Sequence, residues 1–269
     1  MESLKLDQRN KAIERWLSPP DPSTNYINAL EKRYEDTGLW FLQSDSFMEW
    51  KTRRNSFLWL HGISGCGKTI LSSAIIEDLK NFLSSKTVLY FYFDFNDSRK
   101  QTHENMVRSL ISQLYYRSDE TSKLLESLFS SCEDGRQQPT YESLCKVLLQ
   151  MIEQIKEVWV VLDALDECST RRESPTKGLL MWMRDLRKSD ERNVHLLITS
   201  QPKYDIESGV REFAQNDELV PIQSDHITRD IRAYVRMRLT EDKGLKRWQS
   251  TPDVQDEIED LLMKKANGM

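Results

Sequence analysis

From residue 56 onward, short apolar runs alternate with segments in which apolar residues recur every three or four positions. Short continuous runs are typical of strands covered on both faces, and the three-to-four spacing is typical of helices that bury one side. The predicted strands are Ser56–Leu60, Thr87–Phe93, Val158–Leu162, Val194–Ile198 and Glu218–Ile222. This alternation predicts an α/β fold in three layers, with a mostly parallel five-stranded sheet between helices.

Two helices are especially clear, at residues 141–155 and 227–239, and a C-terminal helix follows them. The apolar face of the C-terminal helix consists of Val254, Ile258, Leu261 and Leu262. Polar loops are predicted at residues 131–140 and 170–177, each of which holds one proline. The sequence stops soon after the last helix, and we interpret this ending as a truncation.

The first fifty residues predict a helical appendage. Ile13, Trp16 and Leu17 share one face of a first helix, which nearby prolines end. Ser23 is the expected N-cap of a second helix. The apolar residues that this second helix is expected to turn inward are Tyr26, Ile27 and Leu30.

Composition narrows the classes of function. The 269 residues include 38 lysines and arginines against 43 aspartates and glutamates, for a net charge of -5. This balance lacks the basic footprint of nucleic-acid proteins, so nucleic acid is not an expected partner. The sequence holds no apolar stretch near the roughly 20 residues of a membrane span, and its start lacks the apolar core of a secretory signal. We therefore expect a cytoplasmic protein, whose four cysteines lack metal-site or disulfide spacing and are reduced thiols.

A phosphate-binding motif follows the first strand. Residues 62–69 read GISGCGKT, which matches G-x-x-x-x-G-K-[ST] between a strand and a helix. The glycines let backbone N–H groups face bound phosphates at the positive end of the helix, Lys68 reaches the outer phosphates, and the Thr69 hydroxyl is a ligand of Mg²⁺. The predicted nucleotide contacts are Gly62, Ser64, Gly65, Cys66, Gly67, Lys68, Thr69 and Ile70. Cys66 is either a small loop residue or a redox-sensitive thiol.

An acidic cluster follows the third strand. Asp163 ends the apolar run and is expected beside the phosphate loop, where a carboxylate holds Mg²⁺, usually through water. Asp166 and Glu167 are the candidate catalytic acids that orient or activate the attacking water, and which of them is the base stays open. The structural alternatives are a strand-end cap for Asp163 and a solvated helix start for the other two.

Several segments together resemble a known family. Residues 162–167, LDALDE, resemble the extended Walker B box of NACHT domains, which are P-loop NTPase modules of STAND signalling proteins. Further similar segments are WLSPPDPS at 16–23, TGLWF at 37–41, YFYFDF at 90–95, VRSLI at 107–111 and DIRAYV at 230–235. These are similar to the fungal, nephrocystin-like type, which often carries ankyrin or other repeats downstream. The resemblance covers nearly the whole chain.

The resemblance implies a three-layer P-loop NTPase fold that binds ATP or ADP with Mg²⁺. It places Thr37 and Gly38 on the adenine side of the pocket, with Trp40 as either a base contact or a core residue. It divides the chain into an N-terminal helical segment at 1–50, a NACHT domain at 51–240 and the start of a truncated helical region at 241–269. It also implies protein partners through downstream modules, and it leaves ligand-induced oligomerisation open.

One position departs from the family pattern. After the fourth strand, relatives usually place an arginine where this sequence has Gln201, and that arginine senses the terminal phosphate. A neutral amide lacks the charge and planar fork of arginine. We therefore expect slow hydrolysis and weak ATP-versus-ADP discrimination, unless another cation such as Arg108 or Arg171 senses the terminal phosphate instead. His195, inside the strand, is expected to be structural.

Three functions fit these features. The leading hypothesis is a Mg-dependent ATP/ADP conformational switch with slow ATP hydrolysis, which requires differential affinity between states rather than fast turnover. One alternative is a nucleotide-stabilised scaffold that presents partner-binding repeats without hydrolysis. The other is a small-molecule kinase, which needs an arginine-rich lid, whereas the arginine-containing insertion at 170–177 is short. The sequence lacks an Asn-Lys-x-Asp guanine motif after the fourth strand, which favours ATP over GTP.

Overall fold

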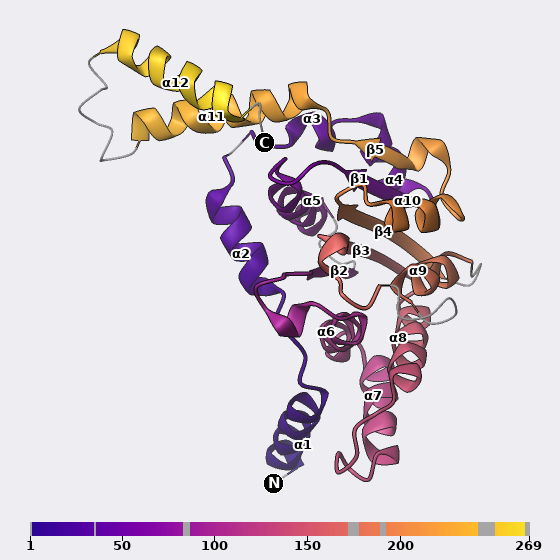
Figure 1. Ribbon diagram of the computed structural model, residues 1–269. Helices are drawn as coiled ribbons and strands as arrows, with labels where there is room; N and C mark the ends of the chain where they lie inside the picture. The colour runs from indigo at the N-terminus through magenta and orange to yellow at the C-terminus, as the bar shows by residue number, and fades with distance from the viewer. Residues whose placement is uncertain are drawn as a thin grey trace.

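A five-stranded parallel sheet forms the centre of the computed structural model, which describes residues 2–34, 36–82, 87–171, 178–188, 192–241 and 251–266. The strands are β1 (Phe57–His61), β2 (Thr87–Tyr92), β3 (Glu157–Asp163), β4 (Asn193–Ser200) and β5 (Leu219–Pro221). Their order is β2-β3-β4-β1-β5, and every neighbouring pair is parallel. Helices lie on both sides of the sheet (Figure 1). The predicted three-layer α/β fold is confirmed.

The described helices connect and flank these strands. Those before the phosphate loop are α1 (Glu2–Leu17), α2 (Ser23–Lys32), α3 (Leu39–Leu42) and α4 (Asp45–Thr52). Those between β1 and β3 are α5 (Lys68–Phe82), α6 (His103–Tyr115), α7 (Asp119–Ser131) and α8 (Tyr141–Ile155). The later ones are α9 (Leu179–Arg187), α10 (Tyr204–Arg211), α11 (Ser224–Glu241) and α12 (Pro252–Ala266). Short 3-10 turns occupy Ser98–Lys100, Leu165–Glu167 and Asn216–Glu218.

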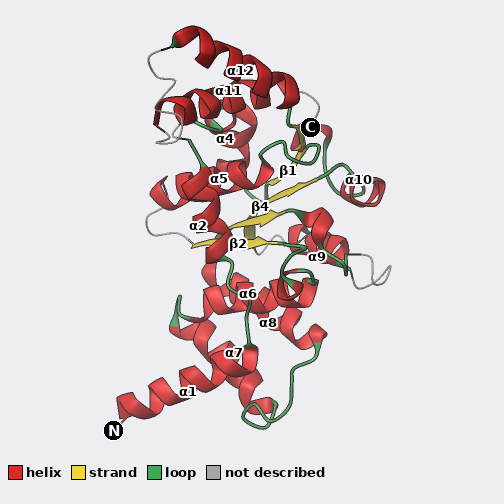
Figure 2. Cartoon of the chain, turned by 60° about the vertical axis from the view of Figure 1, so that its left-hand side comes forward, coloured by secondary structure: helices red, strands yellow, loops and turns green. Residues whose placement is uncertain are grey.

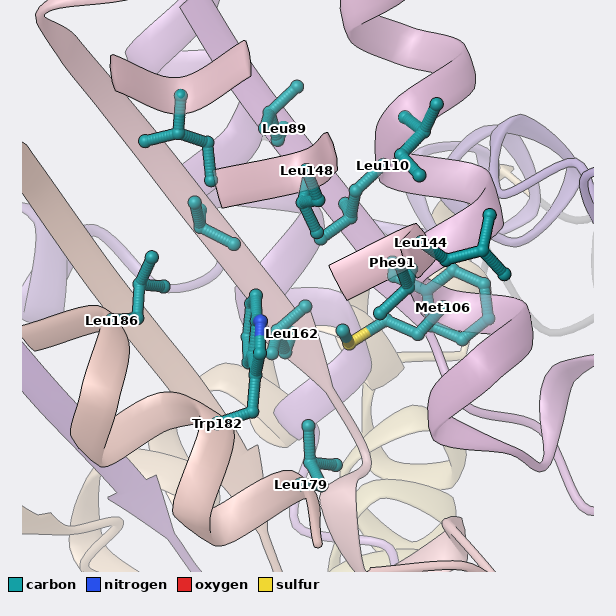
Figure 3. Close-up of a cluster of buried hydrophobic side chains, with 14 of the residues drawn as sticks. Leu89, Phe91, Met106, Leu110, Leu144, Leu148, Leu162, Leu179, Trp182 and Leu186 are labelled. Carbon is teal, nitrogen blue, oxygen red and sulfur yellow. The ribbon is translucent and has the colours of Figure 1, made fainter. Parts of the chain in front are cut away.

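Two hydrophobic cores cover the two faces of the sheet. Alternate strand residues, such as Val160 and Leu162, pack with α1 and α6 to α10, and Figure 3 shows part of this core around Trp182. The intervening residues, such as Val161, pack with α3, α4 and α5. Because both faces are buried, the strands are continuously apolar rather than alternating, as their sequences predicted. This burial fixes the strand ends that carry the candidate site.

The N-terminal segment joins these same cores. The indole of Trp16 on α1 donates a hydrogen bond to the carbonyl of Gln137 at 2.7 Å and packs edge-on against Phe129 of α7. Arg108 on α6 donates to the carbonyl of Leu17 at 2.9 Å. In Figures 1 and 2, α1 lies at the opposite end of the molecule from α11 and α12. The division of the chain near residues 50 and 240 stays a prediction.

The second helix begins and packs differently from the prediction. Ser23 is its first residue and Pro22 its N-cap, because Asp21 accepts hydrogen bonds from the Ser23 N–H and hydroxyl at 2.8 and 2.9 Å and so caps the helix start. Ile27 is exposed, whereas Ala29 is buried. The predicted inward position of Ile27 is wrong, because Ile27 lies on the solvent side of α2 and the helix contacts α5 through another side.

The C-terminal helix also differs from its predicted face. Leu261 and Leu262 are 52% and 45% exposed, while Glu259 and Met263 are buried against α11. Glu259 points inward because Arg232 and Arg236 of α11 pair with its carboxylate at 3.2 and 2.7 Å.

The two predicted loops have different outcomes. Residues 132–140 do connect α7 and α8 without helix or strand, as predicted. Of the loop at 170–177, residues 172–177 lie outside the described residues.

Candidate functional site

The motif at residues 62–69 forms a loop between the carboxyl end of β1 and the start of α5. Gly65 and Gly67 have φ angles of +77° and +84°, in the left-handed region that favours glycine. A Cβ added at either position would meet no described atom within 4 Å. The backbone conformation, not crowding, therefore requires glycine there, and the space over the loop is open to a ligand.

The Lys68 side chain folds onto this loop. Its Nζ atom donates to the carbonyl oxygens of Gly62 at 2.9 Å and Ile63 at 2.7 Å. Cys66 is buried, and a Cβ on Gly62 would lie 2.6 Å from its Sγ atom. This tight packing supports the interpretation of Cys66 as a small loop residue.

Asp163 ends β3 inside a shell of hydroxyl groups. Its carboxylate, 1% exposed, accepts hydrogen bonds from the hydroxyls of Thr69 at 2.7 Å, Ser72 at 2.6 Å and Thr199 at 2.7 Å. β4 lies between β1 and β3, so its Thr199 bridges the gap between the acidic strand and the phosphate loop. Burial raises the pKa of Asp163, although these donors and the charge of Lys68 act to lower it. The predicted juxtaposition of Asp163 and Thr69 is present.

Asp166 is held from several sides in the 3-10 turn after β3. Its Oδ1 atom accepts from the backbone N–H of Gln201 at 3.0 Å, and its Oδ2 atom lies 3.7 Å from the ammonium of Lys203. Its carbonyl accepts from Arg171 at 3.2 Å. Asp166 is buried, so it is not the solvated helix-start acid of the structural alternative.

Glu167 is the more accessible of the two acids. Its Oε2 atom accepts from the backbone N–H of Phe95 at 2.8 Å. Burial raises the pKa of Glu167; the Phe95 N–H acts to lower it, and the nearby charges of Asp166, Asp94 and Asp163 raise it further. A carboxyl group with a raised pKa is suited to proton transfer near neutral pH.

An apolar pocket of about 300 Å³ borders the phosphate loop at Gly65, Cys66 and Gly67. Its lining includes Thr37, Trp40, Ile70, Ile222, Ile231 and Tyr234. Gly38, with φ +82°, supports this wall from behind, since a Cβ there would lie 2.7 Å from the Leu71 side chain. Asp230 of α11 accepts from the Gly38 N–H at 3.1 Å and from the Trp40 indole at 3.2 Å. Trp40 is thus both a pocket wall and an anchor for α11.

A second, polar pocket of about 270 Å³ adjoins the apolar one. The predicted residues that line this pocket are Ser64, Gly65, Gly67, Lys68, Thr69, Ile70, Asp166, Glu167 and Gln201. Gly65, Gly67 and Ile70 line both pockets, so the two form one site with a polar and an apolar end. Cys66 lines the apolar end, and Gly62 lies beneath the loop, its carbonyl bonded to Lys68. A nucleotide has the same division into phosphate and base.

Thr69 and Asp163 are the residues of this site that could take part in holding a cation. Among the described residues, no cluster of three or more histidine, cysteine, aspartate or glutamate side chains could hold a metal ion. Magnesium typically takes few protein ligands and completes its shell with phosphate oxygens and water. The Thr69 hydroxyl with Asp163 behind it fits that requirement, and a divalent cation there would offset the burial of the carboxylate.

Several site residues were missed in the sequence. Asp230, Lys32 and Ile222 line the apolar pocket, and Ser72 and Thr199 bind Asp163. Ser72 had a readable signal, because it lies one helical turn after Thr69 on the same face of α5. The others come from distant segments, and no local pattern marks them.

His195 has the structural role that was expected. It is fully buried in β4, its ring stacks on Trp159 with centroids 4.4 Å apart, and its Nδ1 atom lies 2.9 Å from the Ser56 hydroxyl. None of the helices in the described ranges is long and apolar enough to cross a bilayer.

Comparison with known proteins identifies the family of the chain. The family model described as "Nephrocystin 3, N-terminal" matches residues 36–201, which is more than half of the chain. The chain is also 23% identical over 253 residues to vegetative incompatibility protein HET-E-1 of Podospora anserina. That alignment covers 87% of this chain and 17% of the relative, so the chain spans less than a fifth of the relative's length. The chain belongs to the nephrocystin 3 N-terminal family, within the NACHT group of nucleotide-binding signalling P-loop NTPases.

Proposed function

We propose that this protein is a Mg-dependent ATP/ADP switch of a NACHT signalling protein, with slow ATP hydrolysis. The observation that carries the proposal is the joined site, in which a phosphate loop and an apolar base pocket share Gly65, Gly67 and Ile70. One wall of the base pocket is formed by α11, the helix that follows β5. A nucleotide bound here contacts both the loops that follow the strands and this downstream helix.

At the polar end, the backbone of the loop and Lys68 bind the phosphates. Mg²⁺ would be held by the Thr69 hydroxyl, with Asp163 acting through water, and would supply charge neutralisation at the outer phosphates. The three hydroxyl groups around Asp163 fix its orientation.

Hydrolysis depends on the two acids and on Gln201. Glu167 is the general base, because its raised pKa and partial exposure suit proton uptake, while Asp166 is a positioning residue tied to Gln201 and Lys203. Gln201 supplies no charge to the terminal phosphate, so turnover is slow. Gln201→Arg should therefore raise the single-turnover rate; an unchanged rate would show that position 201 does not face the transferred phosphate.

At the apolar end, adenine lies against Trp40 and Tyr234. Because Asp230 ties α11 to the Gly38 and Trp40 segment, movement of α11 changes the shape of the base pocket. Nucleotides that differ in their contacts with the two arrangements shift their populations. Protein partners and ligand-induced oligomers would be engaged through modules that follow α12.

A nucleotide-stabilised scaffold without hydrolysis is the second candidate, and Gln201 favours it. Single-turnover measurements separate the two functions. If the wild type cleaves ATP and Glu167→Gln does not, the protein is the switch with hydrolysis. If the wild type cleaves ATP no faster than Glu167→Gln, the protein is the scaffold. A small-molecule kinase would instead show phosphate transfer to an acceptor other than water.

The nucleotide site itself is tested by calorimetry with Lys68→Ala. Removing this cation should weaken Mg-ATP binding by about tenfold or more, because charge-assisted bonds to phosphate are lost. Lys146→Ala, which removes an exposed lysine on α8, is the matched control and should bind normally. Equal ATP affinity of Lys68→Ala and wild type would refute the phosphate-loop assignment.

A further inference from the structure

A lysine that the family pattern does not mark lies beside the polar pocket. Lys203 occupies the turn between β4 and α10, two residues after Gln201. Its Nζ atom lies 3.7 Å from Oδ2 and 3.4 Å from the carbonyl of Asp166, which itself lines the phosphate end. The Lys203 side chain is 42% exposed, so its ammonium stands at the solvent edge of the site.

The two arginines that could replace the missing charge at position 201 already have several hydrogen-bond partners. Arg171 donates to Asp205 at 2.8 Å and to the Cys168 carbonyl at 2.6 Å, besides its bond to Asp166. Arg108 is buried on α6, where it binds Glu104 and the Leu17 carbonyl. Either guanidinium group would have to break several hydrogen bonds before it could contact a phosphate.

The ammonium group of Lys203 would break only weak contacts. The two contacts of its ammonium group with Asp166 are long for charge-assisted bonds, which are usually about 2.7–2.9 Å. Within the described ranges of the chain, they are the only polar contacts of that ammonium group. Long, half-exposed ion pairs are weak. Asp166 keeps its bond to the Gln201 N–H when the lysine leaves, so the carboxylate is not left without a donor.

The flexible stem of lysine lets its charge change partner without backbone movement. The turn that carries Lys203 is anchored at Gln201, which lines the same pocket as Lys68 and Thr69. Asp166 and Gln201 line the polar pocket and not the apolar one, so the third phosphate of a triphosphate bound with its base in the apolar pocket would add negative charge on the Asp166 side.

We propose that Lys203 is the specificity residue that recognises the terminal phosphate, exchanging its contact with Asp166 for that phosphate when a nucleoside triphosphate binds. The inference rests on the proposed nucleotide site. Lys203 thus supplies the positive charge that Gln201 lacks, and Asp166 holds the lysine in place when no third phosphate is present. Lysine offers a point charge rather than a bidentate fork, so it favours the triphosphate without fixing its geometry.

The test is calorimetry of the full 269-residue chain with ATPγS and with ADP, both with Mg²⁺. Lys203→Ala should weaken ATPγS binding by about tenfold and change ADP binding by less than about twofold, as for loss of one charge-assisted bond. Arg211→Ala removes an exposed positive charge from the far end of α10, the helix that follows Lys203, and should leave both constants unchanged. Lys203→Arg should restore the preference for ATPγS.

A double-mutant cycle separates recognition from mere support of Asp166. Asp166→Asn frees the lysine and should raise the ATPγS-to-ADP affinity ratio, and this gain should vanish in the variant that also carries Lys203→Ala. A gain that persists without the lysine would mean that Asp166 only repels the phosphate, and would overturn the inference. Equal losses for both nucleotides in Lys203→Ala, or no loss, would overturn it as well. In those cases wild-type binding still supports the nucleotide site, whereas absence of any binding to wild type refutes both.

Discussion

The two ends of the site are built in different ways. The phosphate end comes from the ends of β3 and β4 and from the first turns of α5, which supply the buried Asp163 and the three hydroxyls around it. The base end is assembled from segments about 190 residues apart, which Asp230 holds together by bonds to Gly38 and Trp40. The first arrangement suits unvarying recognition of phosphate and metal. The second suits a contact that forms and breaks as α11 moves.

The largest effect is expected from a substitution that disrupts the phosphate end alone. Asp163→Ala should weaken Mg-dependent nucleotide binding by about 10–100-fold, as for other residues that hold a metal through its outer shell. Adenosine, which lacks phosphate, should bind as it does to wild type. Calorimetry with and without Mg²⁺ measures both, with Asp185→Ala, an exposed carboxylate on α9, as control. Equal Mg²⁺ dependence in variant and wild type would contradict the assignment.

A smaller effect is expected at the base end. Asp230→Ala removes the acceptor of two hydrogen bonds and should lower the free energy of unfolding by about 1–3 kcal/mol. It should also weaken ATP, ADP and adenosine binding by similar factors, since all three share the base. Thermal unfolding and calorimetry are the measurements, and Glu257→Ala on α12 is the exposed control. A loss confined to ATP would show that Asp230 acts on the phosphates instead.

The smallest effect is a shift in the pH profile of hydrolysis. A general base must be deprotonated, so the single-turnover rate should fall as pH drops through the pKa of Glu167. Because burial raises that pKa, the fall should begin at a higher pH than for an ordinary glutamate. Glu167→Gln should remove both the rate and the profile. If Asp166→Asn does so while Glu167→Gln does not, the roles of the two acids are reversed.

The contrast between the two ends also explains what the sequence could predict. Lys68, Thr69 and Asp163 lie at strand ends in recognisable local patterns, so the sequence predicted that they lie close together, as they do. Their binding of phosphate and metal stays a prediction, and Ser72 and Thr199 beside Asp163 were missed. Asp230 and Lys32 join the site only through tertiary packing, which a helical period does not encode.

The errors in the helices have the same origin. An apolar residue in a periodic pattern, such as Ile27 or Leu261, is exposed where the neighbouring helix covers a different side. The buried Glu259 depended on two arginines from another helix, which local periodicity cannot reveal.

The central claim is that the bound nucleotide controls the position of α11. Hydrogen–deuterium exchange of residues 227–239, compared between Mg-ADP and Mg-ATPγS, tests it most directly, because exchange reports opening of this helix and its contacts. We predict different protection in the two states, and no difference in Lys68→Ala. Identical protection with both nucleotides bound at saturation would contradict the switch.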